Sequence, residues 1–286
     1  SITDQLLLRS GVFTTNGQLD MSGANELIRV KDGDGNGELR AGNEPVAYTG
    51  ALGQDPSALS VPPRIVYRGD QNISTGDELV RPAEDSLDRQ LEEFVVDMNT
   101  DEGRPVVTLN PDYTVTDRLE ILGGNLSLGS ASIRLEDNDP NQVSTFVRGD
   151  GTLDRGPVPP SEALIFPDVA ESDIGTDGID LVYVNEEGPV TVGIEFPAIE
   201  EENSTNNRDP ELVRDLTVSG PQPVRLREEG TYRVNRDVEV NSGATGATLD
   251  FNGQTLQMNT EETASRRFKV TNNTSDEDDD ALAAPG

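Results

Sequence analysis

One acidic loop holds the residues in this chain that are best suited to bind a ligand: Asp32-Gly33-Asp34-Gly35-Asn36-Gly37-Glu38. Ca²⁺ takes about six to eight oxygen ligands, and acids at alternating loop positions can turn their oxygens toward one point. Three of these residues fall at positions 1, 3 and 5 of a D-x-[DN]-x-[DN]-G pattern. The spacing predicts a structural Ca²⁺ ion held by Asp32, Asp34, Asn36, Glu38 and Glu44. The alternative is a simple acidic turn that holds no ion.

The first half of this loop resembles the calcium-binding loops of EF-hand and dockerin domains. Position 12 of an EF-hand loop carries a bidentate Glu. Here that position is Asn43, and Glu44 follows one place later. The flanking sequence has no clear helices. The resemblance implies an ion that braces a loop and reduces local charge repulsion, and it does not imply catalysis.

The composition excludes several other kinds of chemistry. The chain has no Cys and no His, so it can form no thiolate nucleophile, no Cys/His zinc site and no Ser-His-Asp triad. Paired carboxylates could hydrolyse glycosides without His. With 54 Asp and Glu, however, some pair will always be close, and no pattern marks one as lying in a cleft. We therefore expect a protein that is not an enzyme.

The charge of the 286-residue chain is strongly negative, with 22 Lys and Arg against 54 Asp and Glu, which gives −32. This charge argues against nucleic acid as a partner, since contacts to phosphate need cations. Lys31 and Lys269 are the only lysines. An acid excess with almost no Lys resembles the proteins of salt-accumulating halophilic archaea. Because the Debye length falls to about 3 Å at 1 M salt, we expect stability to depend on molar salt.

The elements that would position these residues are mostly β. Runs rich in β-branched and aromatic residues, separated by turn residues, occur at 64–68, 105–109, 113–122, 125–135, 179–184 and 190–196, and apolar alternation continues through 224–258. We predict a mainly β fold, made of one or more β-sandwiches with Greek-key and hairpin connections and one or two short helices. Asn16-Gly17 and Asn252-Gly253 are predicted to form hairpin turns.

One segment has helical periodicity, and the composition suggests two modules. Residues 82–99 place Leu87, Leu91, Phe94, Val95 and Met98 on one stripe, which predicts a helix. We divide the chain into an N-terminal β module at 1–140, which carries the acidic loop and this helix, a C-terminal β module at 141–274 and a flexible acidic tail at 275–286. Residues 65–70 faintly repeat at 145–150, and both copies contain Arg-Gly-Asp.

Two further features concern where the protein works. No apolar run approaches the length of a membrane span. Sequons occur at Asn72, Asn125, Asn203, Asn272 and Asn273, and these would be glycosylation sites if the chain is secreted.

Two stretches resemble known surface proteins. Residues 11–20, Gly-Val-Phe-Thr-Thr-Asn-Gly-Gln-Leu-Asp, resemble the opening of TasA-type and archaeal bundling-pilus subunits. Residues 267–273, Arg-Phe-Lys-Val-Thr-Asn-Asn, resemble a strand common in haloarchaeal surface β-proteins. The resemblance implies an extracellular filament, pilus or surface layer built from copies of this chain, in which the next subunit supplies a terminal strand to complete a sheet.

The alternative is a virion protein of a haloarchaeal virus, such as a capsid, decoration, spike or tail subunit, which would meet copies of itself and other virion proteins. Such a protein would also assemble without catalysis. A leader cleaved before Ser1 would favour the cell-surface interpretation, and a start codon directly before Ser1 would favour the virion.

Overall fold

The computed structural model describes residues 5–15, 18–20, 26–32, 35–41, 47–49, 64–76, 90–99, 103–110, 112–135, 143–156, 163–165, 178–196, 198, 213–227, 230–241, 247–258 and 267–271. Apart from one helical residue, Ala163, the regular structure in these ranges is strand, which confirms the predicted mainly β class. In the same ranges, no helix has the length and apolar character needed to cross a bilayer. The chain divides into two compact units. Unit 1 is residues 1–138 and 151–165, and unit 2 is residues 139–150 and 166–286.

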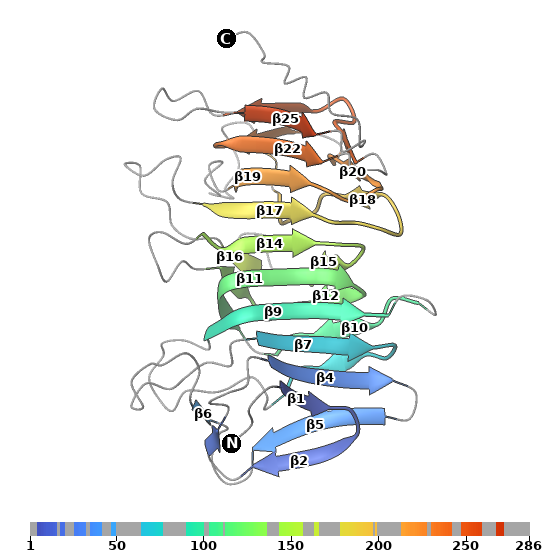
Figure 1. Ribbon diagram of the computed structural model, residues 1–286, viewed down its shortest axis with the longest axis vertical. Coiled ribbons are helices and arrows are strands. Elements are labelled where there is room, and N and C mark those ends of the chain that lie inside the picture. The colour runs from blue at the N-terminus through green and yellow to red at the C-terminus, as the bar shows by residue number, and fades with distance from the viewer. Residues whose placement is uncertain are drawn as a thin grey trace. The chain divides into compact units, whose positions relative to one another are not determined.

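Unit 1 is built from strands that run mostly parallel and alternate between two sheets (Figure 1). Its main sheet has the order β2-β5-β4-β7-β9-β11, with β1 beside β4, β13 beside β11 and β16 beside β13, and its second sheet has the order β8-β10-β12-β15. The strands are β1 (Gln5–Leu8), β2 (Gly11–Thr15), β3 (Gln18–Asp20), β4 (Glu26–Asp32), β5 (Gly35–Ala41), β6 (Ala47–Thr49), β7 (Arg64–Gly69), β8 (Ile73–Ser74), β9 (Gln90–Met98), β10 (Val106–Thr108), β11 (Tyr113–Gly123), β12 (Asn125–Ser127), β13 (Ile133–Leu135), β15 (Thr152–Asp154) and β16 (Leu164–Ile165). From β7 to β12, successive strands alternate between the two sheets. This one-way winding is that of a parallel β-solenoid.

Unit 2 winds in the same way with a third strand in its later coils. Its main sheet has the order β14-β17-β19-β22-β25, a second sheet is β18-β20-β23, and β21 pairs with β24. The strands are β14 (Thr145–Arg148), β17 (Ile179–Tyr183), β18 (Val190–Thr191), β19 (Val213–Val218), β20 (Pro223–Arg225), β21 (Thr231–Val234), β22 (Asp237–Asn241), β23 (Thr248–Asp250), β24 (Thr255–Met258) and β25 (Arg267–Thr271). Two complete coils, β19-β20-β21 and β22-β23-β24, therefore follow one another before β25 begins the next.

The core of unit 2 consists of side chains stacked at equivalent positions of successive coils. Phe146, Leu181, Leu216 and Val238 occupy one such column in register, and none exposes more than 1% of its surface. Burying a large apolar side chain contributes about 1.5–3 kcal/mol. Each coil therefore needs a neighbour on both sides to cover its apolar side chains, since a single coil cannot bury them alone.

The Arg-Gly-Asp stretch at 68–70 forms a turn between sheets. The carbonyl of Lys31 accepts hydrogen bonds from the backbone amides of Asp70, at 3.1 Å, and Gln71, at 3.3 Å. Gly69 has φ +120°, and a Cβ there would lie 1.9 Å from that carbonyl oxygen, so no other residue fits. The repeated stretch at 145–150 likewise contains a main-sheet strand, and Ile73 and Leu153 at the same offset both lie in second-sheet strands. The repeat reflects the winding of the solenoid.

Several finer predictions differ from the structure. The Greek-key sandwich is not confirmed, because the strand pairs given for the described residues are parallel apart from the antiparallel pair of β4 and β5. The Asn252-Gly253 hairpin is wrong: the turn exists, with φ +48° and +75°, but it joins β23 to β24, which pair with different strands in different sheets. Asn16 and Gly17 lie outside the described residues, and the strands that flank them, β2 and β3, pair with β5 and β6.

The helix predicted over 82–99 is also wrong where the structure describes it. Residues 90–98 form β9, which pairs in parallel with β7 and β11. Leu91, Phe94, Val95, Val96 and Met98 are all buried, so both faces of this strand are covered. A strand that is apolar on both faces has no period-two pattern, and its spacing can imitate a helical stripe.

Candidate assembly surface

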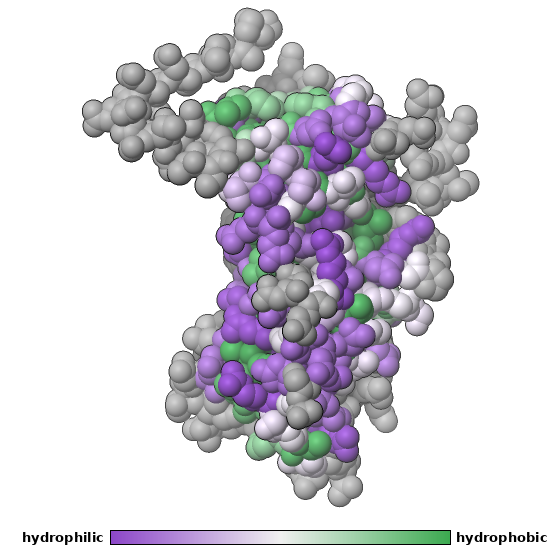
Figure 2. Space-filling view, turned by 90° about the vertical axis from the view of Figure 1, so that its right-hand side faces the viewer, coloured by the Kyte–Doolittle hydropathy of each residue, from purple (hydrophilic) through white to green (hydrophobic). Residues whose placement is uncertain are grey.

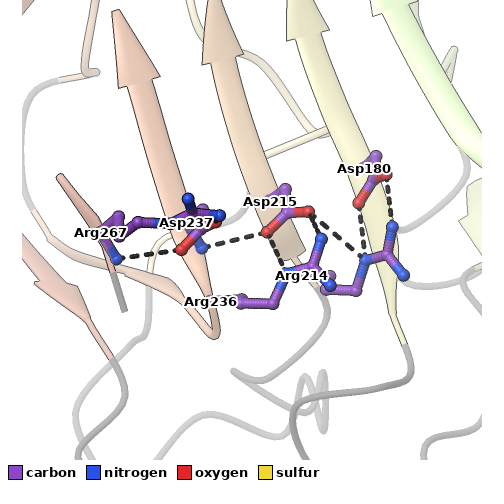
Figure 3. A network of polar contacts seen from close by, with 6 residues as sticks. All are labelled: Asp180, Arg214, Asp215, Arg236, Asp237 and Arg267. Carbon is purple, nitrogen blue, oxygen red and sulfur yellow. Dashed lines mark hydrogen bonds and ion pairs between the residues drawn. The ribbon is translucent and has the colours of Figure 1, made fainter. Parts of the chain in front are cut away.

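A chain of alternating acidic and basic side chains crosses the main sheet of unit 2 (Figure 3). We call this set the charge ladder, and its members are Asp180, Arg214, Asp215, Arg236, Asp237 and Arg267. Arg214 donates to both carboxylate oxygens of Asp180, at 2.9 and 2.6 Å. Arg236 binds Asp215 through two hydrogen bonds in the same way. The ladder continues through the backbone amide of Asp237, which donates to Asp215 at 3.0 Å.

Parallel stacking places acidic side chains of neighbouring strands close together, and the charge ladder offsets their repulsion. Asp180 lies directly opposite Asp215 in the register of β17 and β19, and adjacent strands are about 4.8 Å apart. Like charges at this distance destabilise a sheet. The arginines interleave with the carboxylates, and Arg214 also approaches Asp215 at 3.6 Å. Coil stacking in unit 2 therefore depends on the alternation of charge along the ladder.

Burial destabilises the charged form of Asp180, the first carboxylate of the charge ladder. Burial raises the pKa of Asp180 above its ordinary value, and this outweighs the hydrogen bond and charge of Arg214, which lower it. Nearby Asp215 raises the pKa further. The ion pair therefore compensates only part of the cost of placing this carboxylate in the sheet.

Unit 1 repeats the principle with a simpler alternation. Arg64 lies opposite Glu93 in the register of β7 and β9, and Glu93 lies opposite Arg118 in that of β9 and β11. Arg64 contacts the carboxylates of Glu26 and Glu93, each at 3.4 Å. Acid and base thus alternate from strand to strand across the sheet. Exposed ion pairs contribute only about 0–1 kcal/mol each, so their main effect is to keep like charges from meeting.

In the part of the chain that the structure describes, the charge ladder and the apolar columns of unit 2 both end at β25. Within the described residues, β25 pairs only with β22. Phe268 and Val270 lie in register above Val238 and Val240, which are buried, yet they expose 44% and 61% of their own surfaces. On the other face, Arg267 pairs with Asp237 at 3.0 Å and Lys269 with Glu239 at 3.4 Å. Among the described residues this strand is therefore the edge of the sheet, and Phe268 and Val270 end core columns that no described strand continues.

The main sheet of unit 1 also ends in an exposed apolar strand. β2 pairs in parallel with β5, and Phe13 lies opposite Leu39, which is fully buried. Phe13 exposes 44% of its surface, Val12 50%, and Leu7 of the neighbouring β1 46%. Most of the described surface in Figure 2 is hydrophilic, with smaller hydrophobic patches. Apolar strands at open edges are surfaces that other chains can pair with.

A second unusual group is buried inside unit 2. Arg148 and Glu195 form an ion pair with side chains only 8% and 0% exposed. The Tyr183 hydroxyl donates to Glu195 Oε1 at 3.2 Å, and the Gly193 amide donates to the same oxygen at 2.9 Å. Burial, and next the charge of Glu195, raise the pKa of Tyr183 well above its ordinary value. Tyr183 therefore stays neutral and donates a hydrogen bond. Together, Arg148, Tyr183, Gly193 and Glu195 link strands and loops inside unit 2.

The structure describes three of the five residues predicted to bind Ca²⁺, namely Asp32, Asn36 and Glu38. Asp32 pairs with Gly35 and Asn36 with Lys31 in the antiparallel turn between β4 and β5. Glu38 instead binds Arg40, at 2.7 and 3.1 Å, and that hydrogen bond is the main reason why the pKa of Glu38 is lowered. Asp34 and Glu44 lie outside the described residues. Across the described ranges, no three acidic side chains are grouped to hold a metal, and the ion stays a prediction.

Calcium can be tested directly. If the loop binds an ion, Ca²⁺ at a hundredfold excess over its Kd should stabilise the protein by about 2.7 kcal/mol, measured by thermal unfolding with and without chelator. Asp34→Ala should abolish this gain, whereas Asp276→Ala in the acidic C-terminal run should keep it. Equal gains in both variants would assign the effect to general charge screening and remove the site.

The sequons occupy different surroundings. Asn72 is exposed, and its side-chain oxygen accepts a hydrogen bond from the amide of Val106 at 2.8 Å. Asn125 is half-buried, and its side-chain oxygen accepts from the hydroxyl of Thr152. Asn203, Asn272 and Asn273 lie outside the described residues. Of the described pair, Asn72 is the more accessible to a glycan.

Each unit is a parallel β-solenoid with charge-compensated coils, and within the described residues its main sheet has an exposed apolar strand at one edge, β2 in unit 1 and β25 in unit 2. Comparison with protein-family models, curated proteins and solved structures gave no match.

Proposed function

We propose that this protein is a non-enzymatic structural subunit that assembles with copies of itself in an extracellular filament or surface layer of a halophilic archaeon. The observation that carries the proposal is the core column that, among the described residues, ends at β25, where Phe268 and Val270 stand exposed above buried valines. A strand added to this edge would complete both the sheet and the column. An apolar edge of this kind favours pairing with another chain.

The charge pattern supports the halophilic part of the proposal. The net charge of −32 opposes compaction and association in dilute salt, and molar salt screens it. Within the sheets the charges are already arranged for close stacking, as in the charge ladder. Acidic side chains at the surface then keep the subunit soluble. Pairing of acidic with basic side chains within the sheets reduces repulsion between stacked coils, both within one copy and between neighbouring copies.

Assembly in brine tests the proposal. At about 2 M NaCl, where the Debye length is near 2 Å, sedimentation velocity should show species whose mass grows with protein concentration, and electron microscopy should show their form. A protein that stays monomeric at every concentration and salt would contradict the proposed function. Regular filaments or sheets would support it, whereas closed shells would point to the virion alternative.

A further inference from the structure

We infer that the edge of β25 in one copy pairs with the edge of β2 in the next, so that copies join head to tail. This inference rests on the proposed self-assembly and specifies the two surfaces that meet. The two edges are different strands of the chain. Such a contact is heterologous, and repetition of it produces either a closed ring or an open filament.

Charge disfavours the simplest alternative, in which two copies of β25 pair with each other over residues 267–271. In an antiparallel pair that aligns all five residues, Lys269 would face Lys269 of the other copy, and Arg267 lies two positions along the same face. Like charges directly opposite each other destabilise a sheet. The strand that seats on β25 should therefore carry neutral or acidic residues on this face, as the alternation in both units implies.

The β2 strand meets these requirements. Its sequence, Gly-Val-Phe-Thr-Thr, is uncharged. Phe13 shares a column with buried Leu39, so it lies on the core side and can complete the column of Phe268 and Val270. Val12 and Thr14 then lie on the side that carries Arg267 and Lys269. Apolar residues meet apolar residues, and no cation faces another.

Blocking each edge separately tests the inference. An inward lysine on an edge strand prevents pairing, so Val270→Lys and Phe13→Lys should each weaken polymer growth at about 2 M NaCl by at least about tenfold, measured by sedimentation velocity. Ser130→Lys, which adds the same charge at an exposed turn residue, is the matched control and should polymerise like the wild type. Circular dichroism checks that each variant keeps its strands.

Mixing the two blocked variants gives the decisive result. Each keeps one intact edge, so an equal mixture should form discrete two-chain complexes, whereas either variant alone should not. If the wild type polymerises and Phe13→Lys polymerises equally well, or if the mixture stays monomeric, the pairing of β2 with β25 is overturned while self-assembly stands. If the wild type itself never assembles, the proposed function fails first.

A charge test avoids any change to the core side. At about 0.5 M NaCl, where the Debye length is near 4 Å, Val12→Lys should weaken assembly several-fold, because the lysine would face the cations of β25, whereas within its own copy it lies opposite Glu38. Val12→Gln, which is polar but uncharged, should assemble almost like the wild type. Equal effects of the two substitutions would contradict the proposal that residue 12 lies on the same face of the joined sheet as Arg267 and Lys269.

Discussion

Arg148→Met should destabilise the fold of unit 2 by about 3–5 kcal/mol, because it would leave the Glu195 carboxylate buried and without its counter-charge. Glu195 exposes none of its side chain, and its remaining partners are the neutral donors Tyr183 and Gly193. Burial lowers the pKa of Arg148, but the neighbouring Glu195 charge and hydrogen bond more than reverse this and leave it raised. Chemical denaturation at about 2 M NaCl measures the loss.

Removing both charges should restore most of this stability. In Arg148→Met with Glu195→Gln, the amide oxygen can still accept from Tyr183 and Gly193, and replacing a buried pair by neutral groups is often close to neutral in energy. Arg68→Met provides the matched control. It breaks the Arg68–Asp97 pair, whose side chains are 46% and 39% exposed, and should cost less than about 1 kcal/mol. Equal losses at Arg148 and Arg68 would contradict the importance of burial.

The sequence predicts the β class but not the winding, and the coil lengths explain why. Solenoids are usually recognised from a fixed period. Here Phe146, Leu181, Leu216, Val238 and Phe268 occupy one column, but the lengths of chain between them are unequal. The consistent signal is local: Asp180-Leu181, Asp215-Leu216 and Asp237-Val238 each lie within a main-sheet strand, and Arg directly precedes the last two acids. This short pattern marks β17, β19 and β22, but it is absent from β14 and β25, where Thr145 and Arg267 precede the column residue.

The buried pair gives a weaker signal. Glu195 lies in the run Val-Gly-Ile-Glu-Phe at 192–196, where an acid flanked by large apolar residues is a candidate for burial. Its partner Arg148 is far away in the sequence and belongs to an Arg-Gly-Asp stretch that has the appearance of a turn. No local pattern pairs two residues on different coils. Their contact depends on the register of the strands, which the sequence alone does not show.

No pattern in the sequence places β2 and β25 at sheet edges. Residues 11–20 and 267–273 resemble parts of surface proteins that complete a sheet with a strand from a neighbour, and that mode of assembly stays a prediction. In the structure, β2 and β25 end the main sheets of their own units, and their apolar side chains belong to columns that continue inward. Parallel winding leaves such an edge at any coil that no further strand covers.

Lowering NaCl from about 2 M to 0.1 M should lower the unfolding temperature by roughly 10–20 °C, which corresponds to about 5 kcal/mol for a chain of this size. Two effects oppose each other. Salt weakens the ion pairs of both units, but exposed pairs are worth only about 0–1 kcal/mol each. Salt also screens the repulsion among the 32 excess negative charges, as the Debye length falls from about 10 Å to 3 Å or less. The screening of repulsion should outweigh the weakening of the ion pairs. Calorimetry at a series of NaCl concentrations measures the resulting change in unfolding temperature.

Acidification in low salt should recover part of this loss. Burial raises the pKa of Glu92 and, against the effect of Arg64, that of Glu93. A carboxyl whose folded-state pKa is raised binds its proton more tightly in the folded protein. Stability therefore rises as pH falls from neutral through that raised pKa toward the ordinary value of 4.5, and it is lost again as pH rises. Melting at 0.1 M NaCl should be higher at pH 5 than at pH 7.

The substitution Glu92→Gln distinguishes repulsion at one half-buried carboxylate from the repulsion among all the excess negative charges of the chain. Glu92→Gln removes a half-buried charge whose pKa is raised by burial and then by Asp117, so it should raise the melting temperature at 0.1 M NaCl and change it much less at 2 M. Asp276→Asn removes one charge from the acidic C-terminal run and should give a smaller gain. A melting temperature that is the same at both salt concentrations for the wild type would reject adaptation to brine, because a charge of this size cannot be neutral to screening unless something other than the solvent compensates it.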